Sequence, residues 1–168
     1  SLRSAVTAVV IVILVGAVGV LSWFYIGARG QLEQKARQSE DNVHAEKVAL
    51  QYAGEAAAMN YQNLNAWKER LVAGTSPELK DKLSHAATSM EQILVPLQWN
   101  STAQPLAAKV RSVAGGAYVV DAFVSVLTKT AQATEPLQST ATYSVTVDST
   151  KDWQITDVGG VGDTLGQK

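Results

Sequence analysis

The chain contains no cysteine, only two histidines, and no surplus of basic over acidic residues. Without cysteine it has no disulfides, no thiolate metal ligands and no cysteine nucleophile. Its 14 basic and 15 acidic residues give a formal net charge of −1, which provides no basic surface for nucleic acid. These absences favour a protein whose partners are not nucleic acids.

Charge is also lacking over a long N-terminal stretch, because no charged residue lies between Arg3 and Arg29. As a helix, residues 4–28 would measure about 38 Å at about 1.5 Å per residue. A bilayer's hydrocarbon core is about 30 Å thick, so this stretch can cross it with some tilt. It is too long for the apolar core of a cleaved signal peptide. We predict a single transmembrane helix over residues 1–29.

Two groups of residues in this stretch suit a membrane setting. The aromatic residues at its end are typical of interfacial anchors: Trp23, Phe24 and Tyr25. Small residues would let another helix pack closely: Gly16, Gly19 and Ser22. The stretch has no Gly-x-x-x-Gly motif, so docking on a larger protein is favoured over self-dimerisation.

The charges that flank the stretch leave its orientation open. Arg3 precedes it, whereas Arg29, Lys35 and Arg37 follow it. By the positive-inside rule this count favours a cytoplasmic C-terminus. The basic residues that follow are interleaved with acids, and the chain opens with Ser1 instead of Met. We therefore expect further residues upstream, which could reverse the balance.

A long helix is expected next. Residues 30–44 are highly polar and predict a solvated stalk helix, which is favoured over a coiled coil because polar residues interrupt the heptad seam. The helix should continue to about residue 59, where small apolar residues recur at helical spacing and should pack on a sheet. These residues are Ala45, Ala49, Tyr52, Ala53, Ala56 and Met59.

Two shorter helices are expected after the long one. The first covers residues 61–72, and its apolar face consists of Leu64, Trp67 and Leu71. Ser76 and Pro77 are typical of the start of the second, and Pro96 should end it. Its expected apolar face consists of Leu79, Leu83, Ala86, Ala87, Met90 and Leu94.

Beyond about residue 100, alternation of period two replaces the helical pattern. Strands are expected over residues 106–113, 118–127, 140–147 and from 153 onward, joined by a turn at 115–116 and loops at 130–138 and 148–152. The core face of the second strand should consist of Tyr118, Val120, Ala122, Val124 and Val126. Helices followed by a four-stranded antiparallel meander define an α+β fold.

The expected domain covers residues 45–160 and is followed by a tail at 161–168. The glycines at 159, 160 and 162 resemble a phosphate-binding loop, but such a loop needs a helix N-terminus behind it. No helical segment follows them, so we interpret the run as part of the tail.

Residues able to carry chemistry are few. We interpret His44 and His85 as surface residues. Asp121 is the best candidate for an acid–base group on a strand. By alternation it lies opposite the core face, where it should be exposed or paired with Lys109 or Arg111 on the neighbouring strand. We therefore expect no catalytic residue, no metal site, no cofactor and no enzymatic activity.

The order of these elements resembles the Mce-associated membrane proteins of actinobacteria, which accompany the mammalian-cell-entry (Mce) lipid importers. The segments that carry the resemblance are Leu79-Lys80-Asp81-Lys82-Leu83, the strand from Ala114 to Leu127, Tyr143 to Val147, and Asp152 to Val158. The resemblance implies an NTF2-like/VirB8-like cone, with helices packed on a four-stranded antiparallel sheet. It also implies a single-pass protein of the cytoplasmic membrane, with its N-terminus in the cytoplasm and its C-terminal domain extracytoplasmic (periplasmic).

The function implied by this resemblance is that of a non-enzymatic accessory subunit, of the type of the Luc proteins. Such a subunit stabilises or regulates a lipid-import complex, and its partners are the lipid bilayer, a membrane permease and Mce-type subunits. Two alternatives stay open. One is a membrane-anchored lipid-binding module, with a lipid ligand in a pocket lined by Tyr118, Val124 and Tyr143. The other is a VirB8-like assembly subunit of a secretion system.

Overall fold

The structure is a computed structural model that describes residues 33–133 and 135–160. Within these ranges no helix is long and apolar enough to cross a membrane. The predicted span over residues 1–29 lies outside them, together with its packing residues and its aromatic anchors. The chain divides into two units, residues 1–41 and 42–168. In the first unit the described residues, 33–41, are helical.

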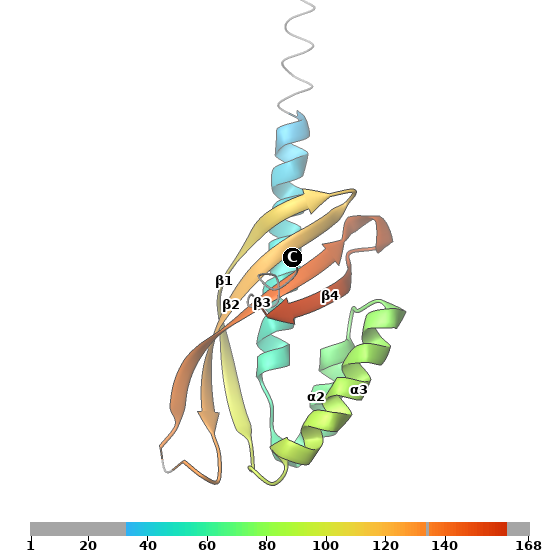
Figure 1. Cartoon of the computed structure of the whole chain (residues 1–168). Coiled ribbons are helices and arrows are strands. Elements are labelled where there is room, and N and C mark those ends of the chain that lie inside the picture. The colour runs from blue at the N-terminus through green and yellow to red at the C-terminus, as the bar shows by residue number, and fades with distance from the viewer. Residues whose placement is uncertain (1–32, 134, 161–168) are drawn as a thin grey trace, which may run out of the picture. The chain divides into compact units, whose positions relative to one another are not determined.

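The second unit is an α+β domain in which the helices precede the strands (Figure 1). Its helical elements are residues 42–57, η1 (Tyr61–Asn63), α2 (Leu64–Val72), α3 (Pro77–Leu94) and the 3₁₀ turn η2 (Ser149–Lys151). Its strands are β1 (Asn100–Ala114), β2 (Ala117–Lys129), β3 (Leu137–Asp148) and β4 (Gln154–Gly160). They form one antiparallel sheet in the order β1-β2-β3-β4. The predicted helix-then-meander order is therefore confirmed.

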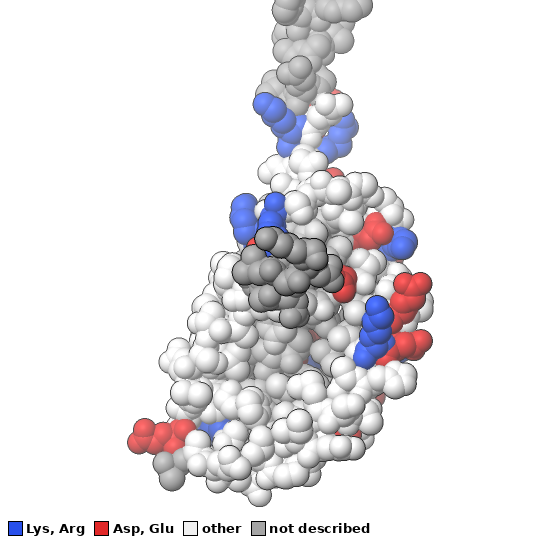
Figure 2. Space-filling view, in the orientation of Figure 1, with Lys and Arg blue, Asp and Glu red and all other residues white. Residues whose placement is uncertain are grey.

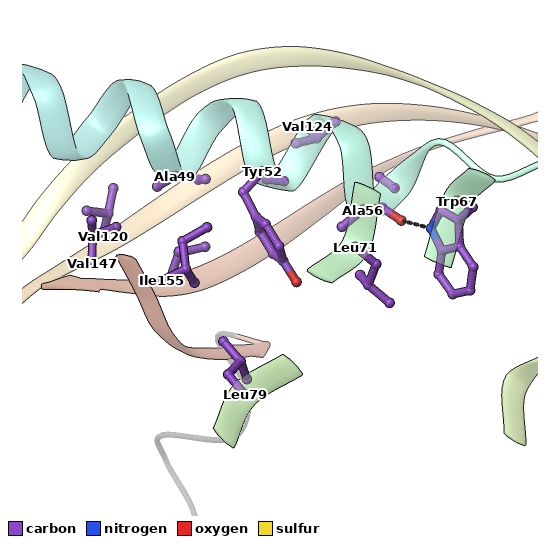
Figure 3. Packing of buried hydrophobic residues seen from close by; sticks show 14 of the residues in the cluster. Ala49, Tyr52, Ala56, Trp67, Leu71, Leu79, Val120, Val124, Val147 and Ile155 are labelled. Carbon is purple, nitrogen blue, oxygen red and sulfur yellow. Dashed lines mark hydrogen bonds between the residues drawn. The ribbon is translucent and has the colours of Figure 1, made fainter. Parts of the chain in front are cut away.

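Helix 42–57 packs on the sheet through small side chains. Five of the six residues of the predicted stripe are buried, whereas Met59 lies beyond the end of the helix and is partly buried. Three alanines on one face of the helix are fully buried: Ala45, Ala49 and Ala53. Their small side chains let the helix approach the strands closely. All five predicted core residues of β2 are also buried: Tyr118, Val120, Ala122, Val124 and Val126. Figure 3 shows this layer, with the helix above Val120 and Val147 of the sheet.

The C-terminal end of helix 42–57 is held by three side chains from other elements. The last carbonyls of a helix have no partner within it, and here no glycine cap follows. The three hydrogen bonds run from Trp67 Nε1 to Ala56 O (3.0 Å), from Ser101 Oγ to Ala57 O (2.7 Å) and from Arg70 Nη2 to Ala58 O (3.2 Å). The first is drawn in Figure 3. The end of the helix is thus tied to both α2 and β1.

Helix α3 starts as predicted, because the Ser76 side chain accepts a hydrogen bond from Leu79 N and Pro77 occupies the first turn. Its predicted apolar face is only partly right. Leu79, Ala87 and Leu94 are buried, whereas Ala86 is exposed and Met90 is 40% exposed. The domain therefore buries a narrower stripe of α3 than the sequence predicted.

Three strand boundaries differ from the prediction. β1 begins at Asn100 instead of Leu106, because its first residues pair with the end of β2, Asn100 opposite Lys129. β3 begins at Leu137, inside the predicted loop, and pairs with Thr128. The interpretation of all the glycines as a tail is wrong for residues 159 and 160, which belong to β4 and pair with β3. In each case a neighbouring strand extends the ladder beyond the local pattern.

Candidate functional site

A cavity of about 230 Å³ lies between helix 42–57, the turn that joins α2 to α3, and β4. The helix contributes one face, on which residues recur at helical spacing, and the turn and β4 contribute the opposite walls. The lining residues are Val48, Gln51, Tyr52, Glu55, Ala73, Gly74, Trp153 and Ile155.

Main-chain hydrogen bonds hold the turn wall against β4. Ile155 N donates to Gly74 O (2.9 Å), and Ser76 N donates to Ile155 O (2.8 Å). Gly74 has a φ of +70°, which glycine adopts without the strain of a Cβ. The cavity is therefore bounded by a fixed element on this side.

The aromatic wall is the Trp153 side chain, which comes from a strained piece of backbone. Asp152 and Trp153 both have positive φ angles, +53° and +57°, and such a conformation is a clear outlier for a bulky residue. The Trp153 ring lies 5.5 Å from the ring of Tyr118 and 4.5 Å from that of His44. Strain of this kind persists where the surroundings determine it, and it gathers at ligand-binding positions.

Tyr52, on helix 42–57, lines the cavity and carries a hydroxyl group without a hydrogen-bond partner among the described residues. The residue is 4% exposed, and its hydroxyl has no hydrogen-bond partner among the described residues. Burial, assisted by nearby Tyr143, raises the pKa of Tyr52 far above its ordinary value, so the phenol stays neutral. Buried polar groups without a partner are uncommon in proteins. Figure 3 shows the hydroxyl pointing away from its helix, into the space between Ile155 and Leu71.

The residues proposed from the sequence as pocket lining lie elsewhere. Tyr118 is buried against Trp153, one layer behind the cavity wall. Val124 is fully buried in the core. Tyr143 is partly buried, and burial raises its pKa. None of these residues is among those that line the cavity.

The cavity residues that sequence reasoning missed come from three separate elements. Val48, Gln51 and Glu55 share one face of helix 42–57 with Tyr52, and their spacing of three and four residues was visible in the sequence. The sequence around Trp153 gave no sign that its side chain would lie opposite this face, because the position of the side chain depends on the backbone turn before β4.

Asp121 lies on the sheet face opposite the core, as predicted, and it pairs with Arg111. Arg111 Nε is 3.8 Å from Asp121 Oδ1, and Arg111 Nη2 donates to Ser144 Oγ (3.0 Å). Lys109, the other predicted partner, instead pairs with Glu46 of helix 42–57 (3.1 Å). Arg111 of β1 thus links to Asp121 of β2 through an ion pair and to Ser144 of β3 through a hydrogen bond.

The two histidines are exposed, as predicted. His85 Nδ1 contacts the main-chain oxygen of Asp81 one turn earlier in α3 (2.8 Å). Over residues 33–133 and 135–160, no group of three metal-ligating side chains comes together.

Apolar side chains are exposed at the end of the domain where α3 meets β1 and β2 meets β3. From residue 83 to residue 108 the sequence has one formal charge, Glu91, and Lys68 pairs with it. Figure 2 shows this lower part of the domain as mostly white apart from red and blue atoms at its lower left, while more red and blue atoms gather at the right, where Figure 1 places the start of α3. The exposed residues near this end are Met90, Ile93, Val95, Leu127 and Leu137, and Leu106 and Phe123 are exposed near the middle of β1 and β2. Exposed apolar patches of this kind are typical of protein-binding surfaces.

No family model matches the chain, and no curated protein matches it. Solved structures do match. The chain is similar to the periplasmic domain of DotI, with 18% identity and a TM-score of 0.53 over 67% of this chain and 91% of that one. It is also similar to CagV, a VirB8 homolog of the T4SS from Helicobacter pylori strain 26695, with 6% identity and a TM-score of 0.51 over 68% of this chain and 93% of that one. The described domain therefore has the NTF2/VirB8-like fold.

Proposed function

We propose that this chain is a non-enzymatic, membrane-anchored subunit that assembles or stabilises a multi-subunit transport complex of the cell envelope. The observation that carries the proposal is the VirB8-like fold, which matches nearly the whole of two domains, one periplasmic and one a VirB8 homolog of a secretion system. The charge-free stretch at residues 4–28 supplies the anchor. The domain lies outside the cytoplasmic membrane and contacts its partners there.

Two specific complexes have support of different kinds. The fold likeness supports a VirB8-like assembly subunit of a secretion system. The sequence resemblance, through segments such as Tyr143 to Val147 and Asp152 to Val158, supports an accessory subunit of an Mce-type lipid importer, which binds the permease and the extracytoplasmic Mce subunits. The two functions share their topology and differ in the proteins that they contact.

A lipid-carrying function has less support. An engineered apolar cavity of about 150 Å³ holds a single benzene molecule, so the cavity of about 230 Å³ is small for an acyl chain or a sterol. Native mass spectrometry of the full chain tests this alternative, because a carrier would retain bound lipid.

Affinity purification of the tagged full chain, expressed at its natural level and extracted in mild detergent, tests the proposal. We expect either a permease with Mce-type subunits or the components of a secretion apparatus to be recovered in fixed ratio. The variant carrying both Gly16→Leu and Gly19→Leu should insert normally but recover less of them, because bulk there blocks close helix packing. Recovery of the wild-type chain without any transport or secretion subunit would contradict the proposal.

A further inference from the structure

The cavity beside Tyr52 has the composition of a site for a cationic group on an apolar stem. Among the described residues that line it, Glu55 is the one with a formal charge, and Gln51 is its polar neighbour. The remaining walls are apolar or aromatic, with Val48 and Ile155 on opposite sides. A basic group would therefore meet its opposite charge, and a hydrocarbon stem would meet apolar surface.

Glu55 accepts one hydrogen bond and still has acceptor capacity. Its Oε1 accepts one hydrogen bond from Gln51 Nε2 (3.0 Å), one helical turn earlier. A carboxylate has two oxygens and about four lone-pair positions, so Glu55 can accept further donors. Guanidinium and ammonium groups donate the charge-assisted bonds that carboxylates favour.

Trp153 offers a second feature that cations bind. Cations are attracted to the face of an aromatic ring, and tryptophan is the strongest of these partners. Contacts with Tyr118 and His44 and an unusual backbone conformation fix the ring at the cavity wall. The structure thus maintains a strained residue at the position where a cation–π contact would form.

Tyr52 adds wall surface between Glu55 and Trp153, because it lines the cavity while being almost fully buried. Its hydroxyl is itself buried, so Glu55 and Trp153 supply the features that a cation would meet.

We propose that this cavity receives one arginine or lysine side chain of a partner protein, which pairs with Glu55 and packs its stem between Val48, Trp153 and Ile155. The inference rests on the proposed function, since it needs a protein partner. Buried arginine side chains seated in such pockets commonly dominate the affinity of protein interfaces.

Blocked arginine (N-acetyl-arginine methylamide) is the probe, and blocked citrulline is its neutral control of the same shape. Both are titrated into the full chain in detergent micelles, and the indole NMR signal of Trp153, assigned with Trp153→Phe, is followed. We expect saturable shifts with blocked arginine and affinity about tenfold weaker for blocked citrulline, because a charge-assisted hydrogen bond is replaced by a neutral one. Equal shifts with the two probes, or no shift with blocked arginine, would overturn the proposal.

Glu55→Gln is the matched variant, because its amide oxygen can keep the hydrogen bond from Gln51. It should lower the affinity for blocked arginine to that of blocked citrulline. Glu135→Gln makes the same charge change in the exposed loop between β2 and β3 and should leave the affinity unchanged. If both variants weaken binding equally, the effect is one of net charge and the proposal is wrong.

Purification of the Glu55→Gln chain from native membranes separates this inference from the proposed function. Reduced recovery of partner subunits supports the occupied cavity. Recovery equal to that of the wild-type chain rejects the cavity as a contact and leaves the assembly function standing. If the wild-type chain recovers no partner, the proposed assembly function is wrong. The proposal that a partner's side chain occupies the cavity is then wrong as well.

Discussion

At the residue scale, Ser101 links the end of helix 42–57 to the sheet through one hydroxyl. Its Oγ donates to Ala57 O (2.7 Å) and accepts from Met59 N (3.1 Å) and Trp99 Nε1 (3.4 Å). The residue is 4% exposed, so solvent does not replace these bonds when they are lost. A small polar residue at the start of β1 thus caps a helix that has no glycine at its end.

Replacing this serine by alanine tests the cap. Ser101→Ala leaves the Ala57 carbonyl without its donor, and we expect the free energy of unfolding to fall by about 1–3 kcal/mol. Ser112→Ala, at an exposed position of β1, should change it by less than about 0.5 kcal/mol. Urea unfolding followed by circular dichroism measures both. Equal stability of the two variants would show that the cap contributes nothing.

Tyr52 predicts how stability depends on alkaline pH. Its pKa is raised by burial in the folded state, whereas an unfolded tyrosine ionises near pH 10. Above that pH the unfolded chain binds fewer protons than the folded one, so stability falls as the pH rises towards the folded pKa. Below about pH 10 both forms are protonated, and this residue adds no pH dependence.

Tyr52→Phe should therefore make the loss of stability above pH 10 shallower. The free energy of unfolding is measured between pH 8 and pH 11.5, with Tyr61→Phe as the control, because Tyr61 lies outside the buried cluster. A slope unchanged by Tyr52→Phe, or changed as much by Tyr61→Phe, would remove Tyr52 as the cause.

At the element scale, the hairpin between β1 and β2 requires two consecutive glycines. Gly115 and Gly116 have φ angles of +57° and +86°, as the favoured two-residue hairpin turn demands. A Cβ on Gly116 would also lie 2.5 Å from Cγ2 of Thr150, in the turn before β4. This turn therefore couples the first hairpin to the last.

Gly116→Ala should lower the free energy of unfolding by more than about 1 kcal/mol, from the positive φ alone, with the close contact adding to the loss. Gly160→Ala is the matched control, because a Cβ there meets nothing within 4 Å, and its effect should be below about 0.5 kcal/mol. Thermal unfolding of the two variants and of the wild-type chain measures both changes in stability. A smaller loss for Gly116→Ala than for Gly160→Ala would refute the steric account.

The elements that the sequence predicted well are those whose signal is local. The alternation in β2 identified its core face because every second residue from Tyr118 to Val126 is apolar. The start of β1 was missed because it depends on Lys129 and Met59, which lie far from Asn100 in sequence. The cavity was missed for the same reason, since Glu55 and Trp153, which both line it, lie far apart in the sequence.

At the scale of the whole molecule, the described domain combines a VirB8-like fold with an uneven distribution of charge. Charged residues gather near the start of α3, whereas apolar side chains are exposed near its end, at Ile93, and on β2, at Phe123 and Leu127. On the outer sheet face, the ion pair between Arg111 and Asp121 ties two strands together. These features favour a protein that acts by binding other proteins.

Site-specific photo-crosslinking in the native cell tests that claim most directly. A photoreactive amino acid replaces Gly19 in the charge-free stretch or Phe123 on the domain, and the captured proteins are identified by mass spectrometry. We predict that both positions capture subunits of one transport complex, a permease from position 19 and an extracytoplasmic subunit from position 123. Capture of no transport or secretion subunit from either position would contradict the account.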